Sequence, residues 1–132
     1  MVAEKPNLDQ ISAEIGFDLA EKNKERAKEF ERIVTRALGI LVEDGLLAYA
    51  IWLESEEESK IIKSSFDLLK DKVGIIQKEY KDVKDTEKLR KAILEEITSD
   101  IQKTLLARQL LEKMLIYARY RAKALQKSGE MS

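Results

Sequence analysis

Four basic side chains near the C-terminal end of the chain have the type and spacing needed to bind phosphate. Arg119, Lys123 and Lys127 recur every four residues within the stretch MLIYARYRAKALQK, and Arg108 lies about three helical turns earlier. Guanidinium and ammonium groups in such a row contact a nucleic-acid backbone without reading its sequence. The same pattern also describes an ordinary solvated helix face, with cations placed favourably near a helix C-terminus. The row of charges alone leaves both interpretations open.

A long helix that begins at Ser99 or Asp100 and continues to about Gln126 is expected to position these side chains. Its apolar residues recur at helical spacing and predict one buried seam, made of Thr104, Ala107, Leu111, Met114, Leu115, Ala118, Ala122 and Leu125. The four basic residues fall on the opposite side, whereas Arg121 is expected nearer the edge of the core. One face of this helix is therefore predicted to be basic.

The composition indicates a single all-α domain, a bundle of about five to seven helices. The chain has 132 residues, of which 44% are hydrophobic and 37% are charged, with only five Gly and one Pro. Residues 1–6 and 128–132 are expected to be mobile tails. The net charge is −1, so any nucleic-acid surface must be local. The high Lys and Glu content is typical of a thermophile, and the absence of a membrane span or an N-terminal secretory segment fits a cytoplasmic protein.

The remaining helix boundaries follow from caps, glycines and apolar spacing. The run Leu46–Leu53 contains eight apolar residues and is predicted to be the central core helix, with Leu47 and Trp52 in the core. A first helix is expected to carry Leu8, Ile11, Ile15 and Leu19 on its packed face. The other expected features are a helix start at Asn7, a break near Asn23, a left-handed glycine stop at Gly45, a cap at Ser55, a helix continuing through Gly74 to Tyr80, and a cap at Asp85.

No pattern of catalytic or metal-binding residues is present. Cysteine and histidine are absent, so thiolate chemistry, the common zinc sites and imidazole acid–base catalysis are excluded. Glu54, Glu56, Glu57 and Glu58 point in different directions on a helix, so they do not indicate a metal site. Tyr49 and Trp52, three residues apart, indicate core packing rather than a base-stacking surface. We therefore expect no catalytic residue, no metal and no cofactor.

Two segments, VTRALGILVEDGLLAYAIWLES (34–55) and SDIQKTLLARQLLEKMLIYARYRAKAL (99–125), resemble the small helical subunit of the type III-B (Cmr) CRISPR RNA-guided effector complex. In that family an Asn/Asp-Gly-Leu turn joins two helices, and here the turn is Asp44-Gly45-Leu46. The last helix of the family ends in an aromatic, basic, Ala-rich block, which corresponds here to residues 117–124. The N-terminal NLDQISAEIGFDLAEK stands where the family has its first helix.

The resemblance implies a non-catalytic role in antiviral defence. Copies of such a subunit stack along the guide RNA–target RNA duplex beside other Cmr subunits, so the implied partners are those subunits, further copies of this chain, and both RNAs. No membrane and no small-molecule substrate is implied. On this interpretation Arg108, Arg119, Lys123 and Lys127 contact the RNA backbone. The acidic segment Glu54–Glu58 and the basic last helix would offer opposite charges to neighbouring copies.

Other classes remain open at this stage. Small subunits of type III-A and type I-A effectors are also helical. A free-standing helical adaptor that binds another protein through an apolar groove would show no dependence on RNA. An enzyme would need a cleft with perturbed carboxylates, a feature that a sequence does not reveal.

Overall fold

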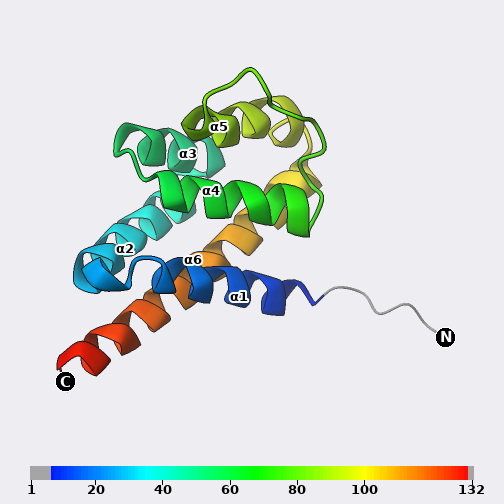
Figure 1. The fold of residues 1–132 in the computed structure, drawn as a ribbon. Coiled ribbons are helices and arrows are strands. Elements are labelled where there is room, and N and C mark those ends of the chain that lie inside the picture. The colour runs from blue at the N-terminus through cyan, green and yellow to red at the C-terminus, as the bar shows by residue number, and fades with distance from the viewer. Residues whose placement is uncertain (1–6, 131–132) are drawn as a thin grey trace.

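The computed structural model describes residues 7–130, with side chains described for residues 7–127, and it confirms the predicted all-α class (Figure 1). The described part of the chain contains no strand and six α-helices: α1 (Leu8–Glu21), α2 (Ala27–Asp44), α3 (Leu46–Ser55), α4 (Ser59–Asp67), α5 (Lys88–Ala92) and α6 (Ile101–Glu130). Residues 1–6 and 131–132, expected as tails, lie outside the description, and α6 continues past its predicted end to Glu130. Within residues 7–130, no helix is both long and apolar enough to cross a membrane.

Several predicted helix ends are confirmed by hydrogen bonds. The Asn7 side chain accepts a bond from the Gln10 N–H at 3.1 Å and starts α1. Asp100 does the same for the Lys103 N–H at 3.1 Å and starts α6. The chain breaks after α1 as expected, and the buried Asn23 amide donates to the Leu19 carbonyl at 2.8 Å. The side-chain acceptors of Asn7 and Asp100 satisfy backbone N–H groups that a helix start leaves unpaired.

The predicted cap at Ser55 is wrong. Ser55 is the last residue of α3, and its hydroxyl donates back to the Trp52 carbonyl at 2.8 Å. The helix ends through a pair of backbone bonds, from Glu58 N–H to Leu53 O at 3.0 Å and from Glu57 N–H to Glu54 O at 3.1 Å. This pattern satisfies helix-end carbonyls and places Glu57 at a positive φ of 55°. The glutamate run is therefore a tight turn before α4 and not the first turn of a helix.

Gly45 joins α2 directly to α3. Its N–H donates to the carbonyls of Ile40 and Leu41 at 3.2 and 3.1 Å, and its carbonyl accepts from the Tyr49 N–H at 3.1 Å. The predicted stop is confirmed, but φ 96° with ψ −178° is not the left-handed helical region that was expected. A side chain disfavours this backbone conformation, so glycine suits a junction of one residue.

The core contribution of α3 differs from the prediction. Leu47 and Trp52 are only partly buried, whereas Leu46, Tyr49, Ala50 and Leu53 are fully buried. The reason is that α3 is apolar on all sides and sequence periodicity does not show which side faces inward. The Tyr49 hydroxyl lies 2.8 Å from the Ser65 hydroxyl, which itself donates to a carbonyl of α4, so Tyr49 donates to Ser65. This buried bond ties α3 to α4.

The helix predicted to continue to Tyr80 ends earlier. A π-helical segment, η2 (Leu68–Lys72), extends α4, and Gly74 with φ 77° ends it. An irregular loop follows, and the short 3-10 turn η3 (Asp85–Glu87) leads into α5, so Asp85 lies inside a turn rather than at a helix cap. A second π-helical segment, η4 (Ile93–Ile97), extends α5.

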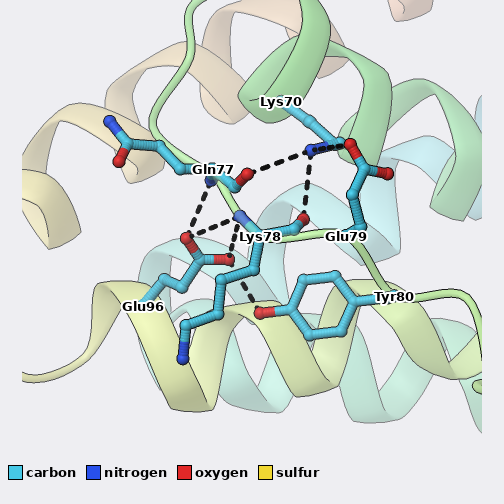
Figure 2. A network of polar contacts seen from close by, with 6 residues as sticks. All are labelled: Lys70, Gln77, Lys78, Glu79, Tyr80 and Glu96. Carbon is cyan, nitrogen blue, oxygen red and sulfur yellow. Dashed lines mark hydrogen bonds and ion pairs between the residues drawn. The ribbon is translucent and has the colours of Figure 1, made fainter.

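The Glu96 carboxylate on η4 holds this loop in place (Figure 2). It accepts hydrogen bonds from the Gln77 N–H at 2.8 Å, the Lys78 N–H at 3.2 Å and the Tyr80 hydroxyl at 2.7 Å. Burial opposes ionisation, but the bonds from Gln77, Tyr80 and Lys78 outweigh it and hold the pKa of Glu96 below its ordinary value. The folded state therefore favours the ionised form.

The packed face of α1 is rotated from the predicted one. Ser12, Gly16, Leu19 and Ala20 are buried, while Leu8, Ile11 and Ile15 are only partly buried. Small side chains let α1 approach α6 closely, as Figure 1 shows where the two helices cross. A Cβ added at Gly16 would lie 2.2 Å from the Met114 carbonyl oxygen of α6. Hydrophobic periodicity misses this contact because glycine and serine carry no apolar signal.

The seam predicted for α6 is confirmed with small changes. Ala107, Leu111, Met114, Leu115, Ala118 and Ala122 are fully buried, and Leu110 joins them. Thr104 and Leu125 lie at the edge and are partly buried. Both α1 and α2 pack along this seam.

Gly16→Ala should destabilise the protein by about 1–3 kcal/mol, because the methyl group forces α1 away from α6. Gly39→Ala is the matched control, since Gly39 lies in α2 with no heavy atom within 4 Å of the added Cβ. That control should gain about 0.5–1 kcal/mol from helix propensity. Urea unfolding measures both, and equal stabilities of the two variants would contradict the close contact.

The Glu96 bonds also predict a pH dependence of stability. Because the folded pKa is lowered, the stabilisation is complete above the unfolded glutamate pKa of about 4.3 and is lost as the pH falls through the folded value. Glu96→Gln should lower the free energy of unfolding by about 1–2 kcal/mol at neutral pH. It should also make that free energy depend less on pH in the acid range. Glu95→Gln, an exposed neighbour with a 3.9 Å ion pair, should unfold like the wild type. If the stability of wild type and Glu96→Gln falls in the same way as the pH is lowered, the Glu96 bonds are not the cause of the pH dependence.

Candidate nucleic-acid interface

The four basic residues predicted on α6 have different surroundings. Lys123 and Lys127 are exposed, Arg119 is half-buried, and none of the three forms an ion pair with another described side chain. The Arg108 guanidinium already has partners within the protein, since its Nε lies 3.0 Å from Glu112 Oε1 and its Nη2 donates to the Val42 carbonyl at 2.6 Å. The structure therefore keeps three of the four together as available cations and uses the fourth to join α6 to α2.

Arg119 has an unusual environment. Its Nε is enclosed and has no hydrogen-bond partner among the described atoms. An enclosed donor without a partner is unfavourable, because it has lost its bond to water.

Arg121 lies at the core edge, as expected. Its guanidinium stacks 4.3 Å from the centroid of the Phe17 ring, and its Nε donates to Glu21 Oε1 at 2.8 Å. A second guanidinium nitrogen contacts the same carboxylate. These contacts join α6 to α1, so Arg121 has a structural role that the neighbouring lysines do not have.

A second basic row, which the sequence reasoning missed, lies on α2. Lys28, Arg32 and Arg36 recur every four residues, are exposed, and form no ion pair with another described side chain. The signal in the sequence was this spacing, but it was hidden inside a mixed polar stretch that also contains glutamates. Only the packing of α2 along α6 brings the two basic rows to one face.

A groove of about 910 Å³ lies along the basic row of α2 and reaches α6. Its lining comprises Lys28, Glu29, Glu31, Arg32, Thr35 and Arg36 from α2 together with Gln126 from α6. Gln126 donates to Glu31 at 2.8 Å near one end of α6, while Arg108 reaches Val42 near the other, so the helices run antiparallel. Arg119 and Lys123 lie seven and three residues before Gln126, on the same side of α6.

The acidic segment expected to face a neighbouring copy is partly used inside the chain. Glu54 binds Arg90 at 2.8 Å and Glu58 binds Arg26 at 2.9 Å. Both pairs are only partly exposed, and they link the turn after α3 to α5 and to η1 (Lys24–Arg26). The charge left for an external partner at this segment therefore comes mainly from Glu56 and Glu57.

Within the described residues, no group of three or more Asp or Glu side chains is arranged to hold a metal ion. Comparison with known proteins gives no match to a family model, to a curated protein or to a solved structure. The candidate interface is therefore argued from its own geometry.

Replacing the ion-paired Arg121 and replacing the exposed Lys123 should have different effects on stability. Arg121→Ala should cost about 1–2 kcal/mol, since it removes an ion pair and a cation–π contact. Lys123→Ala should stay within about 0.5 kcal/mol of the wild type, because Lys123 is exposed and forms no ion pair with a described side chain. Chemical unfolding of both variants tests this, and a common midpoint would contradict the structural role of Arg121.

Proposed function

We propose that this protein is a non-catalytic, RNA-backbone-binding small subunit of a type III-B (Cmr) RNA-guided effector complex. One observation carries the proposal: a row of basic side chains on α2 lines a groove that reaches α6 at Gln126, and a second basic row lies on the same side of α6, in a chain whose net charge is only −1. The groove lining holds three cations, Lys28, Arg32 and Arg36, against two acids, Glu29 and Glu31, and the exposed Lys123 and Lys127 of α6 add to this local positive charge. A local basic surface suits contact with RNA inside an assembly without general polyanion binding.

A surface for protein partners accompanies this groove. Ile101 is 78% exposed and Leu105, one turn later on α6, is 54% exposed. The Arg108 contact with the Val42 carbonyl brings half-exposed Val42 to the same part of the molecule. Exposed apolar side chains close together are typical of interaction sites, which supports membership of an assembly. On this proposal the partners are other Cmr subunits and further copies of the chain, in the cytoplasm.

The same apolar surface is the observation that favours the second candidate, a helical adaptor that binds protein alone. The two candidates differ in what the basic groove does. An adaptor has no use for unpaired cations on α2 and α6, whereas an RNA-binding subunit depends on them. RNA binding that responds to those cations is therefore the discriminating measurement.

The test is the binding of a fluorescently labelled single-stranded RNA to the purified protein, measured by anisotropy over a range of salt. If Arg119, Lys123 and Lys127 each neutralise one phosphate, replacing all three by Ala should reduce the salt slope by about two. Between roughly 50 and 200 mM salt, the wild type should therefore lose about tenfold to twentyfold more affinity for RNA than the triple variant loses. The triple variant should stay folded, because these residues lie outside the buried seam.

The control is Lys81/Lys84/Lys91→Ala, which removes the same charge from exposed lysines that lie away from the groove and outside the ion pairs of the described side chains. It should leave the slope unchanged. Equal salt slopes for wild type and the α6 triple variant would mean that the row is only a solvated helix face. No binding of RNA by the wild type would favour the adaptor instead.

A further inference from the structure

Trp52 lies in a second groove, on the other side of α2. It is the single tryptophan of the chain and is partly exposed. The groove has a volume of about 450 Å³ and lies between α2 and α3. Ile33 and Trp52 supply its apolar lining, and the polar groups come from Glu29, Arg32, Arg36, Glu56 and Glu58. Tyr49, one turn earlier, is fully buried, whereas Trp52 is only partly buried and lines this groove.

Arg32 and Arg36 belong to both grooves. They lie on the exposed side of α2, between the basic α2–α6 groove and the Trp52 groove. Two exposed arginines four residues apart are separated by about 6 Å along the helix, which lets them hold one phosphate together or two in succession. A nucleotide whose phosphate is bound by Arg32 and Arg36 has its base within reach of the Trp52 groove.

The Trp52 groove has the chemistry of a base site rather than a phosphate site. Its arginines are accompanied by Glu56, which is exposed and forms no ion pair with another described side chain. Carboxylates repel phosphate but accept hydrogen bonds from exocyclic amines, such as N4 of cytosine. An indole ring stacks with any base through its π face. Glu58 is already neutralised by Arg26 at 2.9 Å, and Glu29 is a further exposed acid of the lining.

We propose that Trp52 stacks with one unpaired RNA base that carries an exocyclic amine, while Arg32 and Arg36 hold the adjoining phosphate. The ligand is single-stranded RNA, because bases in a duplex are already stacked and paired and do not reach a side groove. Glu56 favours cytosine over uracil, which presents a carbonyl oxygen in place of the amine. This inference rests on the proposed RNA-binding function and adds a base contact to a surface otherwise suited only to phosphate.

The single tryptophan makes the site directly observable. We expect an oligocytidylate to quench Trp52 emission, an oligouridylate of equal length to bind more weakly, and a matched RNA duplex to leave the emission unchanged. Trp52→Ala should weaken oligocytidylate binding by about fivefold to a hundredfold in anisotropy, and Trp52→Phe should retain most of the affinity, since it keeps a ring. Glu56→Gln should reduce the preference for cytosine, and this exposed residue can be changed without disturbing the core.

The matched control is Tyr117→Ala, which removes an aromatic ring that is 43% exposed on α6 and lines neither groove. It should bind oligocytidylate like the wild type. If labelled RNA binds and Trp52 emission does not change, the base site is refuted while the backbone contact stands. If quenching occurs equally with duplex, or Glu56→Gln keeps the full cytosine preference, the proposal is also overturned. If the wild type binds no RNA at all, the proposed function itself fails.

Discussion

The contact between Gly16 of α1 and the backbone of α6 is the constraint on which the rest of the fold depends. The Met114 carbonyl oxygen occupies space that a side chain at residue 16 would need, with only 2.2 Å to an added Cβ. The small side chains of Ser12 and Ala20 continue this surface one turn to each side. Because α1 lies so close, one side of the α6 seam is covered and α2 covers the other. The remaining side of α6 is left to solvent, and the exposed Lys123 and Lys127 lie there.

The parts of the fold that follow from apolar periodicity and capping chemistry were predictable from the sequence. The parts that depend on how the helices pack against one another were not. The α6 seam, the Asn7 and Asp100 caps and the break at Asn23 are local consequences of residue type. The face of α1 that packs most tightly is set by small residues, which carry no hydrophobic signal. In α3 every side is apolar, so only the assembled core decides that Tyr49 is fully buried and Trp52 only partly buried.

The candidate site shows the same division. The row of Arg119, Lys123 and Lys127 is visible in the sequence because it is regular and almost free of acids. The row on α2 is equally regular, but the residues between its members include Glu29 and Glu31, and its importance arises only when α2 lies antiparallel to α6. That Arg108 reaches a carbonyl of α2, 66 residues earlier in the chain, depends on tertiary packing and has no sequence signature.

Internal ion pairs determine where charge is left over in this protein. Several acids are used to join helices, as Glu54 does with Arg90 and Glu21 does with Arg121, whereas Glu29 and Glu31 remain beside the basic row of α2. Such partly exposed pairs add little stability each, so their larger effect is on the distribution of charge. Arg32 and Arg36 form no ion pair with another described side chain, and they lie between the two grooves of α2. A nearly neutral chain can therefore present a polarised surface, because the pairing is uneven and the total charge does not reveal it.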